Sequence, residues 1–495
     1  MLDWLDSRTG FVTMTKEFLT EDVPGGASYW YVFGSATLFA MIVQIVTGIF
    51  LTFFYAPSAA TAWESTRAIY LNPYTHLLLS IHFWGSSAMI ALVFLHLLQT
   101  LVWGAYKSPR EVQWIVGVFL LLITLVLGLT GYLLPWDMDA YFASQVSLNI
   151  AGSAPIAGPL IQSIAQGGGV MGTNTINRFF GLHVWLMPAV LVALVGTHLA
   201  IFRHNGAAGP VTDDPSKLKA GRFWPDQMFM DGAVSLLVFF VIMALAIFAP
   251  PFLDAKADPT NSTFVPYPAW YFLSLFGLLN LVPPEVTIFG ITISLELVAA
   301  LVVPAVLLIA ALALPWLDRS TTRSFKSRAG ILWTTTIIII ALVALSFYAQ
   351  HGIQTQEAAG PPSQSQAAIL AAGAPAAAAA GGGAAAPANA NGAKVYAANC
   401  ASCHGASGAG VPGAFPPLAG NAVVTGDPGK VIGIVVQGLN APISINGTTY
   451  HGQMPAWKGN LSNQDIADVV TYIRGGLGPN KASAVTEAQV AGYKP

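Results

Sequence analysis

The sequence contains very little charge for its length of 495 residues. Lys, Arg, Asp and Glu together make up 9% of the chain, and the formal net charge is −2. A soluble protein carries about 25% charged residues, so this chain has too few to cover a water-facing surface of its size. The deficit excludes a soluble enzyme, a disordered chain and a nucleic-acid binder with a basic face. With 54% hydrophobic residues and a mean hydropathy of +0.61, the composition indicates a polytopic membrane protein.

Cysteine is equally scarce, because Cys400 and Cys403 are the only two in the chain. Two cysteines three positions apart exclude a disulfide framework. They also argue against an iron–sulfur cluster held by this chain, since even the mixed type needs two Cys and two His.

Seven apolar segments are long enough to cross a bilayer, which takes about 20 mainly apolar residues in a helix. They cover residues 29–56, 76–104, 112–134, 180–203, 229–250, 287–316 and 330–350. Residues 1–28 are polar and show no cleavable signal pattern, so we expect the first span to direct insertion. The predicted fold is an all-α polytopic membrane helix bundle with seven spans.

Lysine and arginine are unequally shared between the two sets of loops. One side holds twelve of them: Arg8, Lys16, Lys107, Arg110, Arg203, Lys217, Lys219, Arg222, Arg319, Arg323, Lys326 and Arg328. The other side holds three, Arg67, Arg178 and Lys256. Positive residues favour the cytoplasmic side, so we predict a cytoplasmic N-terminus. Seven crossings of a bacterial inner membrane then place the C-terminus in the periplasm.

The composition changes after the seventh span. Residues 352–390 are rich in Ala, Gly, Pro and Gln, which cannot build a core. We interpret this stretch as a flexible linker, with a partly helical spacer as the alternative. Residues 391–478 regain aromatic and aliphatic side chains and indicate a small soluble domain, which a loose tail extends to residue 495.

The segment Cys400-Ala-Ser-Cys403-His404 matches CxxCH, the attachment signal for c-type haem. The two thiols would bind the haem vinyl groups, and His404 would ligate the iron. A zinc site is less consistent, because the chain has no second cysteine pair. For the other axial position we favour Met454, the only methionine after residue 390, over His451. We therefore expect one covalent haem c with His/Met ligation in a small all-α domain.

Four histidines lie inside the spans: His82 and His96 in the second, His183 and His198 in the fourth. One intramembrane histidine could be a packing residue, but two matched pairs of costly ionisable groups indicate function. Spacings of 14 and 15 residues correspond to about 21–22 Å along a helix. Both spans run in the same direction, so His82 and His183 share the outer level, and His96 and His198 share the inner level. This pattern predicts two non-covalent, bis-histidine haems b stacked across the membrane.

Glycines recur at the histidine spacing in the first and third spans. Gly34 and Gly48 are 14 residues apart, and so are Gly117 and Gly131. Glycine permits the close approach of a flat macrocycle or another backbone. Close helix packing is the alternative explanation, but the shared spacing favours haem binding.

With these motifs, the chain resembles cytochrome b of the quinol–cytochrome c reductase (cytochrome bc/bf) family over about residues 1–350. The matching stretches are Asn177-Arg-Phe-Phe-Gly-Leu-His183, Gly131-Tyr-Leu-Leu-Pro-Trp136, Lys107-Ser-Pro-Arg-Glu111, Ala257-Asp-Pro259 and Pro268-Ala-Trp-Tyr271. The histidine spacings of 14 and 15 residues and the seven spans are similar to those of the bf branch. In that branch a four-helix cytochrome and a three-helix subunit IV are usually separate chains. The resemblance implies a fusion of the two, as residues 1–225 and 226–351, followed by the linker 352–390. Residues 391–495 resemble a class I cytochrome c.

The resemblance also implies roles for individual residues. The outer pair, His82 and His183, would ligate the low-potential haem, and the inner pair, His96 and His198, the high-potential haem. The outer quinol-oxidation pocket would be walled by Tyr132, Pro268, Trp270, Tyr271 and the segment around 152–159. Arg178 would offer a cation to a haem propionate. Arg203 would line the inner quinone site or serve only as a topology charge.

Three positions depart from the family pattern. The family motif is commonly Pro-Glu-Trp-Tyr, but Ala269 replaces the glutamate and cannot transfer a proton. Its substitute would be Glu285, Asp137, Asp139 or water. Leu79 stands where the family usually has an arginine that serves a haem propionate. Val32 stands where the bf branch attaches an extra haem through cysteine, so we expect no covalent extra haem.

The leading hypothesis is a cytochrome b/c subunit of a quinol:cytochrome c oxidoreductase, a redox-driven translocase. The resemblance implies a separate Rieske protein, quinol and quinone, lipid, a periplasmic cytochrome or other acceptor, and a homodimeric complex; no nucleic acid is expected. The alternative is a di-haem conduit to another redox partner without a working outer quinol site, which Ala269 and Leu79 favour. A structural haem anchor and a transporter are weaker alternatives.

Overall fold

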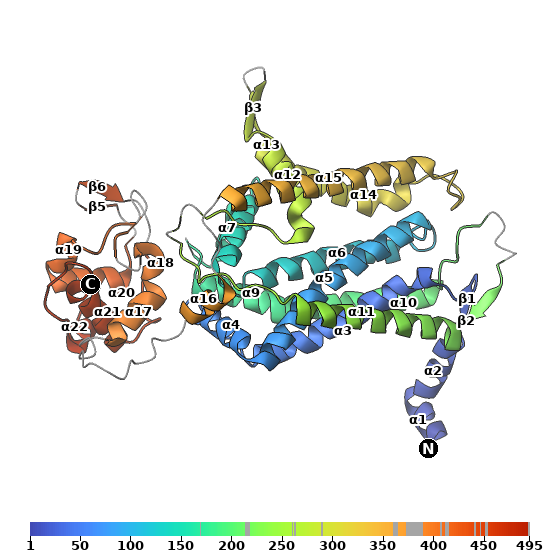
Figure 1. Cartoon of the computed structure of the whole chain (residues 1–495), viewed down its shortest axis with the longest axis horizontal. Helices are drawn as coiled ribbons and strands as arrows, with labels where there is room; N and C mark the ends of the chain where they lie inside the picture. Colours follow the sequence, from blue (N-terminus) through green and yellow to red (C-terminus); the bar gives the residue numbers. More distant parts are fainter. Residues whose placement is uncertain are drawn as a thin grey trace.

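The computed structural model describes residues 1–168, 170–212, 218–259, 261, 264–288, 291–359, 365–372, 390–405, 408–410, 415–439, 442–445, 447–450 and 454–493. A long helical bundle forms one body, and a small helical domain at the C-terminal end of the chain forms the other. Figure 1 shows the small domain at one end of the bundle and the N-terminus at the opposite end.

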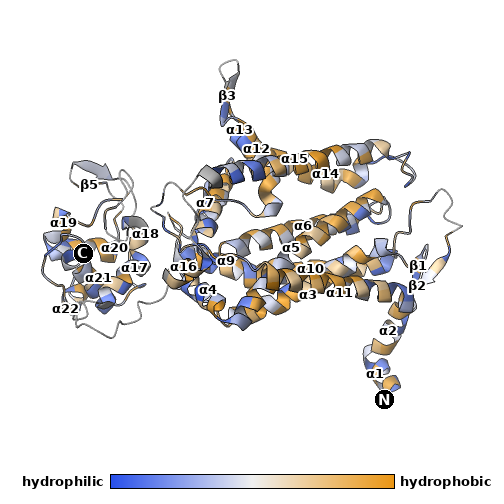
Figure 2. Ribbon diagram, viewed as in Figure 1, coloured by the Kyte–Doolittle hydropathy of each residue, from blue (hydrophilic) through white to orange (hydrophobic). Residues whose placement is uncertain are grey.

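Seven of the described helical segments are long and apolar enough to span a membrane, which confirms the predicted polytopic fold. Their hydrophobic residues run along the length of the bundle (Figure 2). The segments are Tyr29–Thr52, Pro73–Val102, Glu111–Tyr132, Thr173–Asn205, Phe223–Phe248, Leu295–Leu317 and Ala329–Gln356. The chain is thus a multi-pass membrane protein.

The first four spans form the part of the bundle that holds the intramembrane histidines. Their helices are α3 (Val32–Thr52), α5 (Pro73–Val102), α6 (Glu111–Tyr132) and α10 (Met187–Asn205), with α9 (Thr173–Gly181) and the π-helical turn η2 (Leu182–Leu186) preceding α10. Helix α3 packs against α5, and α6 packs against α10. A buried cluster that includes Ala40, Met89 and Leu191 fills the middle of these helices. The fifth span, α11 (Met228–Phe248), covers α3 and α5.

Shorter elements close both ends of the four-helix part. At the end near the small domain lie α4 (Ala62–Leu71), α7 (Met138–Gly152) and α8 (Gly158–Gln166). Trp63 of α4, Tyr141 of α7 and Trp136 of the connection before α7 belong to one buried cluster at this end. At the opposite end lie α1 (Leu2–Thr9), α2 (Phe11–Leu19) and the paired strands β1 (Asp22–Pro24) and β2 (Ala220–Arg222).

Beside α11, the three-helix part contains the last two spans and a short apolar helix. They comprise η5 (Trp270–Phe272), α12 (Leu273–Leu281), α13 (Leu295–Leu297), the π-helical turn η6 (Val298–Val302), α14 (Val303–Leu317) and α15 (Ala329–Ala359). Gly277 lets α12 lie directly on α15, because a Cβ there would come within 2.2 Å of the Leu345 carbonyl oxygen. Trp114 Nε1 donates to Ala311 O at 2.7 Å and joins α6 to α14.

The predicted start of the sixth span at residue 287 is wrong. Residues Glu285–Ile288 (β3) and Ile291–Ser294 (β4) pair as antiparallel strands, and the span begins only at Leu295. The hairpin projects away from the bundle (Figure 1). The segment is rich in β-branched residues, which favour strands, but the hydropathy of a short apolar run does not distinguish a strand from a helix.

Two helical stretches occupy parts of the segment interpreted as a flexible linker. Helix α15 continues to Ala359, and α16 (Gln366–Ala372) packs on the end of the bundle. Gln366 exchanges two hydrogen bonds with the backbone of Leu253, and Arg67 Nε donates to Leu370 O at 2.6 Å. Ile369 is buried in the aromatic cluster. The remainder of the linker, residues 360–364 and 373–389, lies outside the described residues.

The C-terminal domain is helical, as the sequence predicts. It contains α17 (Ala390–Asn399), α18 (Ala401–His404), α19 (Ala422–Thr425), α20 (Pro428–Gln437), α21 (Asn463–Gly475), α22 (Glu487–Ala491) and the paired strands β5 (Ile443–Ile445) and β6 (Thr448–Tyr450). Helices α17 and α21 pack together. Arg474, with 2% of its surface exposed, donates to the carbonyls of Val424 and Gly426 and so ties α21 to the end of α19.

Candidate redox sites

The histidines at the end of the bundle near the small domain face each other. The ring centroids of His82 on α5 and His183 in η2 are 6.1 Å apart, and the ring planes are 78° from parallel. Metal–imidazole nitrogen bonds are about 2 Å long. The separation therefore suits two imidazoles bound to opposite sides of one metal ion.

Two threonines fix the orientation of these imidazoles. Thr47 donates its hydroxyl hydrogen to Val43 O, so its oxygen accepts from His82 Nδ1 at 2.9 Å. Thr130 likewise donates to Val126 O and lies 3.2 Å from His183 Nδ1, whose nearest acceptor is Leu127 O at 3.0 Å. A protonated Nδ1 leaves Nε2 free of a proton and able to bind a metal. Neither threonine is predicted by the sequence patterns, although each directly precedes a predicted glycine, Gly48 or Gly131.

The second pair repeats this arrangement at the other end of the bundle. His96 on α5 and His198 on α10 have ring centroids 6.4 Å apart, with planes 77° from parallel. Within the described residues, their buried Nδ1 atoms make no hydrogen bond of good geometry, and the polar neighbours of the rings are the Gln99 side chain for His96 and the Gln113 backbone for His198. The two pairs therefore differ in the support that the protein gives to the imidazoles.

The four predicted glycines each lie against one of these imidazoles. A Cβ at Gly34, Gly48 or Gly117 would be 3.3, 3.1 or 3.5 Å from the facing histidine Cε1, and a Cβ at Gly131 would be 2.6 Å from His183 Cε1. The glycines thus make room for the histidine rings themselves. This contact gives the 14-residue repeat a specific structural reason.

The donor set fits haem better than a bare metal ion. No group of three or more His, Cys, Asp or Glu side chains that could hold a metal is found in the described ranges. Each buried site offers two imidazoles only, so the remaining ligands must come from the bound group. A porphyrin supplies four nitrogens in a plane and leaves the two axial positions for histidine.

The predicted outer quinol pocket centres on Tyr132 and the loop before η5. The Tyr132 hydroxyl donates its hydrogen to the Asp139 carboxylate, and Tyr267 O lies 3.0 Å away as a second acceptor for the same hydrogen. Tyr267 N donates to the other oxygen of Asp139 at 2.8 Å. Asp139 therefore connects the end of α6 to the loop that carries Pro268 and Ala269.

Two carboxyl groups in this region have raised pKa values. Burial raises the pKa of Asp137 to about 7, and the neighbouring Asp139 charge contributes. Burial also raises the pKa of Asp139, although hydrogen bonds from Tyr132 and Tyr267 N oppose the shift. The carboxyl of Asp137 caps α7 by accepting from Ala140 N and also accepts from Asp254 N. The Asp137 carboxylate is therefore engaged by backbone N–H groups. The Asp139 carboxylate instead bonds to Tyr132 and to the backbone of Tyr267, among the predicted pocket residues.

The other pocket candidates separate into two groups. Tyr271 packs on α6 so closely that a Cβ at Gly128 would lie 2.7 Å from its hydroxyl, and burial raises the pKa of Tyr271 to about 12. Trp270 Nε1 donates to Ser87 Oγ at 3.3 Å, and 47% of the Trp270 surface is exposed. Glu285 lies instead in the projecting β3–β4 hairpin with an exposed side chain. The structure therefore does not bring Glu285 together with Tyr132 and Tyr271.

The two predicted arginines contact protein groups. Arg178 is exposed on α9 and donates to the carbonyls of Ser163 and Ile164 at the end of α8. Arg203, at the end of α10, forms an ion pair with Glu21 and lies over the ring of Phe18. Arg178 thus connects α9 to the end of α8, and Arg203 connects the end of α10 to the segment after α2.

In the C-terminal domain, Cys400 and His404 frame the short helix α18. Cys400 belongs to the hydrophobic core, and the buried His404 ring lies with Nδ1 2.9 Å from Pro416 O. That contact leaves Nε2 of His404 for a metal. Met454 packs against the same core and forms reciprocal backbone hydrogen bonds with Leu439. The side chain of Cys403 and the whole of His451 lie outside the described residues.

An apolar bundle with two facing histidine pairs, joined to a small CxxCH domain, defines a membrane-bound cytochrome. Comparison with known proteins supports each part. Residues 87–256 match the family model Cytochrome b(N-terminal)/b6/petB, residues 256–360 match Cytochrome b(C-terminal)/b6/petD, and residues 389–476 match Cytochrome c.

Individual relatives extend the likeness to whole chains. The chain is 38% identical to the menaquinol:cytochrome c reductase cytochrome b subunit of Geobacillus thermodenitrificans, covering 43% of this chain and 98% of that one. It is 31% identical to cytochrome b of Allochromatium vinosum, covering 70% of this chain and 87% of that one. A solved hyperthermophilic respiratory Complex III chain aligns with a TM-score of 0.60 and 28% identity, covering 75% and 95% of the two chains.

The chain belongs to the cytochrome b family, with the N- and C-terminal cytochrome b parts fused and a cytochrome c domain appended. The predicted family is confirmed. The protein is accordingly an electron-transferring oxidoreductase of the membrane, and its families imply haem b and haem c.

Proposed function

We propose that this chain is the cytochrome b and c subunit of a quinol:cytochrome c oxidoreductase, which couples electron transfer to proton translocation. The two facing histidine pairs, one toward each end of the membrane bundle, carry the proposal. Relatives named menaquinol:cytochrome c reductase subunits support it and make menaquinol the first substrate to test. The proposed setting is a bacterial inner membrane with the N-terminus in the cytoplasm and the C-terminal domain in the periplasm.

The histidine pairs would hold two haems b, and Cys400, Cys403, His404 and Met454 would hold one haem c. Bound haem supplies reversible one-electron transfer. Thr47 and Thr130 would hold the outer imidazoles in the tautomer that ligates iron. The four glycines keep the imidazoles close to α3 and α6.

Quinol would bind at the outer end, against Tyr132, Pro268, Trp270 and Tyr271. We assign proton acceptance to Asp139, because it bonds to Tyr132 and to the Tyr267 backbone beside the position where the family glutamate is missing. Its raised pKa lets it take a proton more readily than an ordinary aspartate. One electron of each quinol would leave to a Rieske protein on a separate chain, and the other would cross the bundle toward quinone at the inner end, where Arg203 lies.

The domain division follows from the same assignment. Residues 1–225 would form the di-haem part, 226–351 the subunit IV-like part, and 391–495 the cytochrome c domain that passes electrons to a periplasmic acceptor. The complex would be a homodimer. Residues 352–390 would form the linker between the two parts, and within it α16 packs on the bundle.

The assay that tests the function is quinol:cytochrome c reduction by the purified complex, with and without an inhibitor of the outer quinol site. We expect turnover that the inhibitor abolishes. Intact haem spectra without inhibitor-sensitive turnover would instead favour the di-haem conduit that lacks a working outer site, which the replacements at Ala269 and Leu79 suggest.

A pyridine haemochrome spectrum of the purified chain tests the cofactor assignment. We expect about two haems b for each haem c, because four membrane histidines form two axial pairs and the chain has one CxxCH motif. A ratio of one to one, or a spectrum without haem b, would refute the assignment of the histidine pairs.

A further inference from the structure

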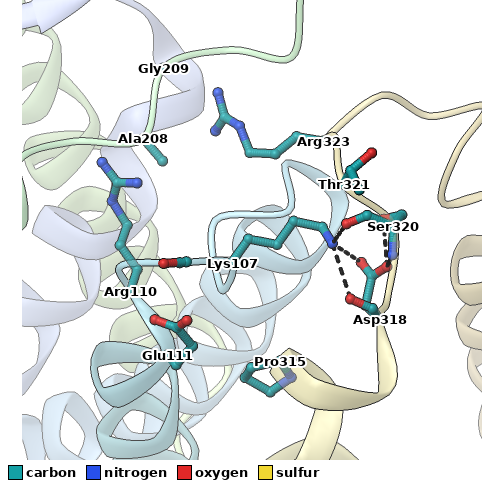
Figure 3. A pocket seen from close by; sticks show the side chains of 11 residues that line it. Lys107, Arg110, Glu111, Ala208, Gly209, Pro315, Asp318, Ser320, Thr321 and Arg323 are labelled. Atoms are coloured by element: carbon teal, nitrogen blue, oxygen red, sulfur yellow. Dashed lines mark hydrogen bonds and ion pairs between the residues drawn. The ribbon is translucent and has the colours of Figure 1, made fainter.

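A polar cavity of about 470 Å³ lies at the end of the bundle away from the C-terminal domain. Three connections enclose it: those between α5 and α6, after α10, and between α14 and α15. Figure 3 shows its charged lining residues, Lys107, Arg110, Glu111, Asp318 and Arg323. None of the proposed haem or quinol residues lines this cavity.

The acidic group on one side of the cavity is already neutralised. Asp318 forms ion pairs with Lys107 at 3.0 Å and with the buried Arg328 at 3.3 Å, and accepts from the Tyr106 hydroxyl at 2.5 Å. Burial alone would raise the pKa of Asp318, but hydrogen bonds from Ser320, Tyr106 and Lys107 outweigh it and hold the pKa below its ordinary value. Asp318 therefore has little capacity left for further cations.

Two guanidinium groups remain on the other side. Figure 3 shows Arg110 and Arg323 turned toward Ala208 and Gly209, away from Asp318. Arg110 uses Nε and Nη2 for the carbonyls of Asn205, Gly206 and Ala207 at the end of α10. Arg323 Nη2 makes one long bond of 3.5 Å to Pro210 O, and its buried Nη1 has no partner among the described residues.

Among the described residues, the charges around the cavity do not balance. Lys107, Arg110, Arg323 and Arg328 contribute four positive charges, and Glu111 and Asp318 contribute two negative charges, which leaves an excess of two positive charges within this described set. Burial and the nearby Arg110 charge lower the pKa of Arg323, the direction expected of a partly desolvated cation without an anion. A bound anion would supply the missing acceptor.

An apolar groove of about 360 Å³ lies next to this cavity, between α6 and α14. It is lined by Ile115, Phe119, Ile309, Leu312, Ala313 and Trp316. On α6, Ile115 is one turn from Glu111 of the cavity, and on α14, Trp316 directly follows Pro315 of the cavity. The positively charged cavity and the apolar groove thus follow each other along α6 and α14.

We propose that the cavity and groove together bind one anionic phospholipid, with its phosphate at Arg323 and Arg110 and an acyl chain between α6 and α14. Basic pockets between membrane helices recognise lipid phosphate in this way. The lipid would join the four-helix part to the three-helix part, which also meet here through the Asp318 ion pairs. The proposal does not depend on the reductase activity.

Lipid retention by the purified full-length chain tests this inference. The protein is delipidated, placed in phosphatidylcholine nanodiscs and titrated with phosphatidylglycerol, and retained lipid is counted by native mass spectrometry. A separate arm adds inorganic phosphate alone. We expect about one phosphatidylglycerol per chain, and Arg323→Gln is expected to weaken retention about tenfold by removing a charge-assisted hydrogen bond.

Two further variants keep the test decisive. Thr321→Glu places a negative charge at the exposed rim of the cavity and is expected to weaken retention independently of Arg323. Arg319→Gln is the matched control, since Arg319 is exposed in the same loop and does not line the cavity. Equal retention by wild type, Arg323→Gln and Thr321→Glu would overturn the proposal. Binding of inorganic phosphate without preference for phosphatidylglycerol over phosphatidylcholine would overturn the lipid assignment.

Discussion

Replacing His183 by leucine is expected to remove one of the two haems b and to stop electron transfer through the bundle. Leucine fills a similar volume in an apolar environment, so the helix is retained, but it offers no nitrogen to iron. The facing His82 would then be a single axial ligand in a site that its geometry adapts to two. Haemochrome spectra should show the ratio of haem b to haem c fall from about 2:1 to about 1:1, together with loss of inhibitor-sensitive quinol:cytochrome c turnover.

The control is His204→Leu, which makes the same substitution on α10 at an exposed position six residues beyond His198. It should leave both the haem ratio and turnover at the wild-type level. Retention of two haems b by the His183→Leu protein would rule out the assignment of the outer pair. Loss of haem from both variants would point to general instability of α10 and its preceding turn.

The positions of the histidine pairs were predictable because they depend on a local repeat. Because the rise per residue of a helix and the direction of each span are known, a spacing of 14 or 15 residues places the histidines at two levels of the membrane. The same repeat identifies Gly34, Gly48, Gly117 and Gly131. The structure explains those glycines by contact with the imidazoles, a detail that the spacing alone did not distinguish from helix packing.

The errors in the predicted fold arise where hydropathy is ambiguous. Residues 285–294 form a hairpin, because their runs of β-branched residues favour strand pairing, and the hydropathy used to place the sixth span does not report that preference. Within the linker, composition could not show that Ile369 and Leu370 would find the aromatic cluster and Arg67 on a distant part of the chain. Such contacts depend on tertiary structure.

Side-chain partners were the least predictable part of the site. The contact between Asp139 and Tyr267 N joins residues 128 positions apart, and the sequence left Asp139 equal to Asp137, Glu285 and water. The ion pair of Arg203 with Glu21 spans 182 positions. Only the fold distinguishes a carboxylate beside Tyr132 from one that caps a helix or lies in an exposed hairpin.

Asp139→Asn is expected to slow quinol oxidation about 100-fold, the lower end of the usual effect of losing a general base. Asparagine preserves the size of the side chain and a hydrogen bond to Tyr132, but it cannot accept a quinol proton. The haem content should therefore be unchanged while turnover falls. Glu285→Gln is the matched control, because Glu285 is the exposed carboxylate that the fold separates from the pocket, and its turnover should equal that of the wild type.

The pH dependence of turnover gives a second, independent test of the role of Asp139. Burial raises the pKa of Asp139, and only its deprotonated form accepts a proton. The wild-type rate should therefore rise as pH increases through a pKa above 3.8, the ordinary value for aspartate. The Asp139→Asn enzyme should lack this rise and retain a slow, flatter profile. If the variant keeps the wild-type rate and profile, or if Glu285→Gln loses turnover instead, Asp139 is not the proton acceptor, and the carboxylate missing at Ala269 is replaced by another group.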